Sequence, residues 1–257
     1  MSPELIKTLK RLGYFLAFFT AAIVILAAVE KKKDSGATGI KIDVEPLPDG
    51  HYLIDSSDIK KTIQRSFAFE WTGQQIGLLN IERLERVLEE DPFIFSADVF
   101  INAKNKIHIK IRQREPVLRI IDDNGLHYYI DIDGNKMPLS KHFSARVMVA
   151  TGSLPPHVPG FLDRKKHLLK DVFLLSRYIE EDRFLRTLIE QIYVSNGKIL
   201  LAPKIGSHKI ILGSMDGIEE KFKRLRLFYD EVTPYEGWRR YRTVNLSYKG
   251  QIVCEKR

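Results

Sequence analysis

The chain has 257 residues and a net charge of +8, with 44% hydrophobic and 29% charged residues, fractions typical of a folded protein that exclude extensive disorder. A single cysteine, Cys254, excludes an intramolecular disulfide and a cysteine-based zinc cluster. The mean hydropathy of −0.19 excludes a protein with many membrane spans, although an average can conceal one apolar segment.

Residues 12–29 form such a segment, LGYFLAFFTAAIVILAAV, which contains no charged residue and no proline. A helix over this segment would be about 27 Å long, enough to cross the hydrocarbon core of a bilayer. A buried soluble helix would need polar residues on one face. A cleavable signal peptide would need a shorter apolar run that ends in a small-residue site, whereas Thr20-Ala21-Ala22 lies inside the run. The pattern favours an uncleaved transmembrane helix over both alternatives.

Basic residues flank this span on both sides, so charge alone does not orient it. Lys7, Lys10 and Arg11 precede it, and residues 31–33 are all lysine. The size of the flanks decides instead: we predict that residues 1–11 are a cytoplasmic tail and that the long remainder is exported. Residues 30–39, which are charged and then small and polar, are predicted to be a short flexible linker.

Residues 40–115 are predicted to form a β-α-α-β-β module. Alternating apolar residues indicate half-buried strands, and apolar residues at helical spacing indicate two helices. The expected elements are a strand at Ile40–Val44, a helix opening at Asp58 with Ser56 or Ser57 as its cap, a helix capped by Asn80 and stopped by Asp91-Pro92, and strands at Ala97–Ile101 and Ile107–Arg112.

Residues 116–257 are predicted to form a strand-rich α+β domain, in which Asn124-Gly125 and Asn196-Gly197 mark hairpin turns. The expected elements are strands at Val117–Ile121, His127–Ile132, Val147–Ala150, Gln191–Ser195, Lys198–Leu201 and His208–Leu212, helices at Asp163–Glu181 and Ile218–Val232, and a terminal hairpin of Thr243–Tyr248 with Gln251–Cys254. On the last helix, Lys221, Arg224 and Arg226 are expected to face largely outward. The fold class is therefore α+β throughout the exported part.

The sequence lacks the motifs of catalysis and of ligand binding. It contains no Gly-Lys-Ser/Thr, no Gly-x-Ser-x-Gly and no His-Glu-x-x-His. Residues 131–135 (DIDGN) resemble part of a calcium loop but lack the third spaced ligand and the distal glutamate, so they are interpreted as a turn. Basic residues are interleaved with acidic ones, which argues against a nucleic-acid partner. We predict no enzymatic activity, no cofactor, no metal and no small-molecule substrate.

Four local patterns follow one another behind the anchor. They are Ile109–Val117 (IKIRQREPV), Tyr128–Gly134 (YYIDIDG), Leu212-Gly213 with Glu220-Lys221-Phe222, and Val244–Tyr248 (VNLSY). With one anchor and one β-α-α-β-β module, this arrangement resembles the FtsQ/DivIB family of cell-division proteins, whose first exported module is a POTRA domain. Asn245 stands where the family often has an acid and Ser247 where it often has an arginine, whereas Tyr248 is retained.

The resemblance implies a non-enzymatic scaffold of the division machinery, anchored in the bacterial inner membrane with a periplasmic C-terminal part and concentrated at the septum. It implies that the strand-rich domain binds the coiled-coil proteins FtsB and FtsL, that the POTRA module binds other division proteins, and that the assembly helps control septal peptidoglycan synthesis. We expect the terminal hairpin to offer a sheet edge to a partner strand. The predicted contact residues are Thr243, Val244, Asn245, Leu246, Ser247, Tyr248, Gly250, Gln251, Ile252 and Val253.

Two other classes of protein stay open from the sequence. A POTRA-containing transport or assembly factor of the envelope would carry several such modules or a barrel of many alternating strands. An anchored cell-envelope hydrolase would carry a cleft with pKa-shifted carboxylates or a serine–histidine pair.

Overall fold

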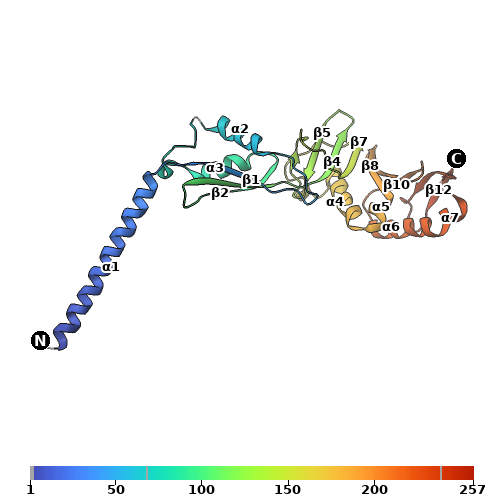
Figure 1. Ribbon diagram of the computed structural model, residues 1–257. Helices are drawn as coiled ribbons and strands as arrows, with labels where there is room; N and C mark the ends of the chain where they lie inside the picture. Colours follow the sequence, from blue (N-terminus) through green and yellow to red (C-terminus); the bar gives the residue numbers. More distant parts are fainter. Residues whose placement is uncertain (1–2, 68, 238) are drawn as a thin grey trace. The chain divides into compact units, whose positions relative to one another are not determined.

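The computed structural model describes residues 3–67, 69–237 and 239–257 (Figure 1). The chain divides into two compact units, Met1–Gln113 and Arg114–Arg257. Of the predicted cytoplasmic tail, residues 1 and 2 lie outside the described residues, and the backbone from Pro3 onward is already helical.

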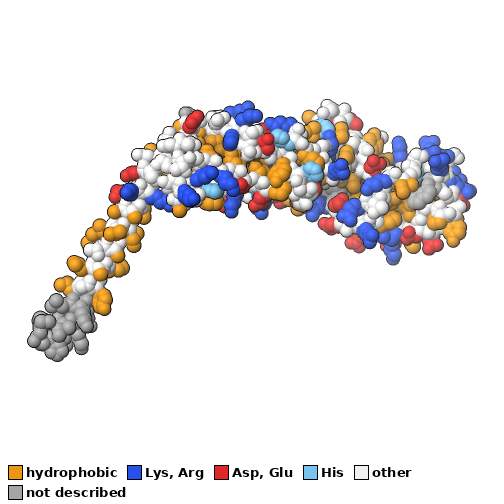
Figure 2. All heavy atoms as spheres, viewed as in Figure 1, with side chains coloured by type: hydrophobic (Ala, Val, Ile, Leu, Met, Phe, Trp, Pro, Cys, Tyr) orange, Lys and Arg blue, Asp and Glu red, His pale blue; other side chains and the backbone are white. Residues whose placement is uncertain are grey.

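The first unit begins with the long helix α1, Pro3–Asp34. Residues 12–34 of this helix are long and apolar enough to cross a membrane, and none of that stretch is buried within the protein. Phe15, for example, is 76% exposed, and hydrophobic side chains cover the described part of α1 in Figure 2. Because exposing so many large apolar side chains to water is unfavourable, these residues require an apolar surrounding such as a bilayer.

The segment after the span is not the flexible linker that the sequence predicted. Helix α1 continues to Asp34, and Gly36 then pairs with Gln75 in an isolated bridge. The backbone N–H of Ala37 donates to the carbonyl of Gln74 (2.8 Å), and Ala37 is 3% exposed. The small residues after α1 were interpreted from the sequence as a sign of flexibility. In the structure, their small size permits close packing and backbone pairing instead.

The remainder of the first unit is a three-stranded sheet with two helices, as predicted. The elements are β1 Gly39–Val44, α2 Ser56–Ser66, the short 3-10 helix η1 Ile76–Leu78, α3 Ile81–Glu89, β2 Ile94–Ile101 and β3 Lys106–Gln113. The strand order is β1-β3-β2, with β1 parallel and β2 antiparallel to β3. Ile107, Ile109 and Ile111 of β3 are fully buried against residues of α2 and α3 such as Ile59 and Leu84.

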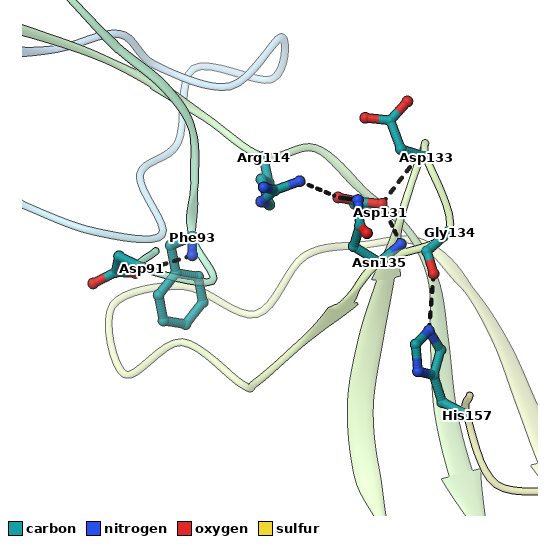
Figure 3. Close-up of polar contacts among 8 residues, drawn as sticks. All are labelled: Asp91, Phe93, Arg114, Asp131, Asp133, Gly134, Asn135 and His157. Carbon is teal, nitrogen blue, oxygen red and sulfur yellow. Dashed lines mark hydrogen bonds and ion pairs between the residues drawn. The ribbon is translucent and has the colours of Figure 1, made fainter. Parts of the chain in front are cut away.

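The caps of the two helices follow from polar side chains just before them. Asn80 caps α3 as predicted, since its Oδ1 accepts from the N–H of Arg83 at 2.8 Å. After α3, the carboxylate of Asp91 accepts from the N–H of Phe93 at 3.0 Å (Figure 3). The cap predicted for α2 was wrong: Asp55, not Ser56 or Ser57, accepts from the N–H groups of Ser57 and Asp58, both at 2.9 Å.

Replacing Asp55 by alanine is expected to lower the free energy of unfolding by ~1 kcal/mol, because two N–H groups lose their acceptor. Ser56→Ala is the matched control and should change stability little, since Ser56 is exposed inside the first turn. Denaturation of residues 31–257 would measure both. The N–H of Asp58 lowers the pKa of the Asp55 carboxyl below its ordinary value of 3.8. The stabilisation that the ionised cap supplies is therefore fully present above pH 3.8 and is lost as the pH falls through the lowered pKa of the folded protein.

The second unit is built on one nine-stranded sheet. Its strands are β4 Pro116–Asp122, β5 His127–Asp131, β6 Lys136–Met137, β7 Met148–Gly152, β8 Ile189–Ser195, β9 Lys198–Pro203, β10 Lys209–Gly213, β11 Tyr241–Asn245 and β12 Val253–Lys256. The strand order is β12-β11-β10-β9-β8-β7-β4-β5-β6. The α+β fold class and the terminal strand pair agree with the prediction.

Helices cover one face of this sheet (Figure 1). They are η2 Phe161–Asp163, α4 Leu168–Glu181, α5 Arg183–Leu188, α6 Ile218–Leu227, the π-helix η3 Phe228–Val232 and α7 Thr233–Glu236. The predicted helix Asp163–Glu181 was too long at its start, because Arg164 is extended with a ψ of 138°. The predicted helix Ile218–Val232 is instead α6 followed by the wider turn of η3.

The expectation that Lys221 faces outward was also wrong. Lys221 is 7% exposed, and its Nζ donates to the carbonyls of Leu212 (3.1 Å) and Ser214 (2.8 Å). Burial lowers the pKa of its ammonium group. The side chain therefore ties α6 to the end of β10, and two carbonyl oxygens compensate for its desolvation.

The Asp-Gly turn of the second unit surrounds a buried carboxylate (Figure 3). Asp131 is 1% exposed and accepts from the N–H groups of Asp133 (3.0 Å) and Asn135 (2.7 Å). It also accepts from Nη1 of Arg114 at 2.9 Å, and His157 Nε2 lies 2.9 Å from the carbonyl oxygen of Gly134. Asp131 therefore organises a turn and ties it to Arg114.

Candidate partner-binding site

The nine-stranded sheet ends at β12. Strand β12 pairs antiparallel with β11, with Val244 opposite Cys254 and Asn245 opposite Val253. No other strand among the described residues pairs with β12 on its outer side. An edge strand of this kind presents backbone N–H and C=O groups that another strand can bind.

The register identifies which of these backbone groups point outward. The N–H of Arg257 donates to the carbonyl of Arg240 at 3.1 Å, so the backbone of Arg257 faces β11. The irregularity in this pair adds its extra residue to β11, between Tyr241 and Thr243, and leaves the alternation along β12 unbroken. The backbone groups of Cys254 and Lys256 therefore point away from β11.

Of the two segments of the predicted edge, Thr243–Tyr248 begins in the inner strand β11, and Gly250–Val253 leads into the edge strand β12. Residues 243–245 belong to β11, which pairs with β10 on one side and with β12 on the other. Val244 and Leu246 are fully buried in the core and cannot offer side chains to a partner. A deletion of residues 243–257 would remove this part of the core and is not a clean test of binding.

The other predicted contact residues lie at the surface or are half-buried. Tyr248 is 49% exposed and Val253 is 42% exposed. The remaining ones are exposed Ser247, Gly250 and Gln251, and half-buried Thr243, Asn245 and Ile252. Their role in partner binding stays a prediction.

Asn245 and Ser247, the two departures from the family pattern, interact with each other. The Oδ1 atom of Asn245 accepts from the N–H of Ser247 (2.9 Å) and from its hydroxyl (2.6 Å). These bonds close the turn that leaves β11. The pair therefore takes a local structural role and supplies no charge for a partner.

Arg224 of α6 holds the connection between β11 and β12. Its Nη1 donates to the carbonyl of Tyr248 at 2.8 Å and also to that of Gln251, and its Nη2 lies 3.5 Å from the carbonyl of Leu246. A guanidinium group suits this task because it offers several donors in a fixed plane. No pattern in the sequence points to this role, since only the fold brings residues 246–251 beside α6.

A groove of about 570 Å³ lies between α6–η3 and this hairpin. Its lining is Arg224, Leu227, Phe228, Glu231, Val232, Tyr241, Gly250, Gln251, Ile252 and Cys254. The rings of Phe228 and Tyr241 pack edge to face with their centroids 5.6 Å apart. Burial raises the pKa of the Cys254 thiol, so this residue contributes apolar surface rather than a reactive thiolate.

Exposed basic side chains surround the open edge and gather at this end of the second unit in Figure 2. They are Arg239, Arg240, Arg242, Lys249, Lys256 and Arg257. Glu236 pairs with Arg240, and Glu255 lies 3.7 Å from Arg242, so the acids neutralise only part of this charge. The edge therefore combines open backbone groups, an apolar groove and a positive potential.

Comparison with known families agrees with the two units. Residues 36–112 match the POTRA-like domain, and residues 115–255 match the domain described as FtsQ/DivIB, C-terminal related. No curated protein matches the chain. The second match covers more than half of the chain, which confirms the resemblance seen in the sequence. The chain therefore belongs to the FtsQ/DivIB family of non-enzymatic cell-division scaffold proteins, held in the membrane by one N-terminal helix.

Proposed function

We propose that this protein is a periplasmic divisome scaffold, concentrated at the septum, that captures a partner by adding the partner's strand to β12. The observation that carries the proposal is the open outer side of β12, where the backbone groups of Cys254 and Lys256 point away from β11. Strand addition derives its affinity mainly from such main-chain groups, and neighbouring pockets supply selectivity.

The partners that fit are the exported segments of FtsB-like or FtsL-like proteins with an acidic, partly apolar strand. Apolar side chains of the strand would enter the groove beside Phe228 and Ile252, and acidic ones would face Arg242, Lys256 and Arg257. The first unit would bind further division proteins, and the assembled complex would regulate septal peptidoglycan synthesis. The scaffold itself carries no catalytic activity in this proposal.

Lys256→Pro is expected to weaken partner capture at least about tenfold, which corresponds to ~1.4 kcal/mol. Proline removes the outward N–H and places its ring on the outer side of the edge. The pairing with β11 is retained, because the lost donor does not face β11. Co-purification of the full chain with tagged FtsB-like and FtsL-like segments would measure the effect.

Lys256→Ala is the matched control, since it removes the same side chain and leaves the backbone donor. It should retain most of the capture and lose only part of the electrostatic attraction. Equal capture by the proline and alanine variants would contradict strand addition at β12. Loss of capture in both variants would point to the charge of Lys256 instead.

Tyr248→Ala is expected to weaken capture less than Lys256→Pro, by ~1 kcal/mol, because a partner loses the contact with its ring. The ring is 49% exposed, so its removal leaves the core intact, and an unchanged unfolding midpoint would verify this. Tyr235→Ala is a suitable control because Tyr235 is 87% exposed and does not line the groove. Equal capture by both alanine variants would exclude Tyr248 from the contact.

A further inference from the structure

Leu78 is an apolar side chain with no packing role in its own unit. It lies in the short helix η1 and is 71% exposed, whereas its neighbour Leu79 is 8% exposed. Single exposed leucines are common on protein surfaces. What distinguishes Leu78 is its place beside the end of the membrane-spanning helix.

Helix η1 is held against the last turn of α1. The N–H of Ile76 donates to the carbonyl of Ser35 at 3.0 Å, and Gly36 pairs with Gln75. Gly77 approaches Lys33 so closely that a Cβ there would lie 3.2 Å from Lys33 Cβ and 3.3 Å from its carbonyl oxygen. A residue with a side chain at position 77 would push η1 away from α1.

This contact sets how far η1 lies from the end of the apolar run, measured along α1. Lys33 follows Val29, the last residue of the apolar run, by four residues, which is about 6 Å along a helix. The headgroup layer on each side of the hydrocarbon core is about 5–8 Å thick. If the apolar run spans the hydrocarbon core, residues 77 and 78 would lie at headgroup level, near the basic residues 31–33 in the last turn of α1.

We propose that Leu78 inserts into the boundary between headgroups and acyl chains, so that η1 makes a second contact between this protein and the membrane. The occupant of this surface is lipid, because it continues the membrane contact of α1 and because Lys31, Lys32 and Lys33 beside it attract anionic headgroups. Two contacts at one end of the first unit limit its tilt relative to the bilayer, whereas α1 alone would leave it free to tilt. This role is separate from partner capture at β12.

The test uses the full chain in nanodiscs of phosphatidylcholine and phosphatidylglycerol. Cys254→Ser removes the one native cysteine, and Leu78→Cys then carries an environment-sensitive NBD fluorophore. The control carries NBD at Tyr52→Cys, where the native residue is 44% exposed. Tyr52 lies at the opposite end of the sheet: Leu53 N–H donates to Gln113 at the end of β3, whereas α1 leads into the strand end at which Gly39 pairs with Lys106.

A lipid with a nitroxide on its headgroup is expected to quench the label at position 78 several-fold more than the label at position 52. In the same nanodiscs, the emission of the label at position 78 should also lie at shorter wavelength than that of the label at position 52. Because Leu78 is exposed, the label displaces no packed neighbour, and unchanged unfolding midpoints would verify the fold of both variants. Equal quenching at the two positions would overturn the proposal.

Discussion

Asp131→Ala is expected to lower the free energy of unfolding of the second unit by ~3–5 kcal/mol, the range typical when one partner of a buried ion pair is removed. The carboxylate is 1% exposed and faces Arg114 at 2.9 Å. Its removal also deprives the N–H groups of Asp133 and Asn135 of their acceptor. Chemical denaturation of residues 31–257, with an unchanged slope, would measure the loss.

Asp133→Ala is the control from the same turn. The Asp133 side chain is exposed, so its replacement should change stability by no more than ~0.5 kcal/mol. Asp131→Asn separates charge from shape, because it keeps one acceptor oxygen and loses the negative charge. Its loss in free energy of unfolding should lie between the losses of Asp131→Ala and Asp133→Ala. A loss below ~1 kcal/mol for Asp131→Ala would mean that the turn does not depend on the carboxylate.

Gly152→Ala is expected to destabilise the second unit by ~2–5 kcal/mol, the sum of a left-handed backbone penalty and of overpacking. Gly152 has a φ of +97° at the end of β7. An added Cβ would overlap the backbone carbonyl oxygen of Val194 and lie 2.9 Å from a ring carbon of Tyr193. Because the oxygen belongs to the neighbouring strand β8, relief requires the two strands to separate.

Gly197→Ala distinguishes steric overlap from backbone strain. Gly197 also has a positive φ, +71°, but a Cβ there would meet no atom within 4 Å. Gly197→Ala should lower the free energy of unfolding by only ~1 kcal/mol. Equal shifts of the denaturation midpoint for both glycine variants would show that overlap with the Val194 carbonyl oxygen adds nothing to the destabilisation by Gly152→Ala.

Local patterns were sufficient for much of the fold. The alternating isoleucines of β3, the Asn124-Gly125 turn and the cap at Asn80 each depend on neighbours within a few residues. One failure, the cap of α2, has an equally local reason. Asp55 competes with two adjacent serines to cap α2, and an aspartate carboxylate is the stronger acceptor.

The candidate site was predicted less well. The sequence identified the terminal hairpin, but it assigned the edge to both strands of the hairpin, because it could not tell which of them has a neighbour on both sides. That depends on β10 pairing parallel with β11, across some thirty residues that include α6 and η3. Arg224 and Lys221 were assigned to solvent for a related reason, since the carbonyls that they bind belong to distant segments.

The 257 residues by themselves determined that the chain has one apolar span followed by two modules, and to which family these modules belong. Periodicity and turn residues carry this information because they act over a few residues. Only the tertiary structure decided that β12 is the open edge, that two basic side chains of α6 hold β10 and the last hairpin, and that η1 packs against the end of α1. These features depend on contacts between segments far apart in the chain, and long-range packing alone brings them together.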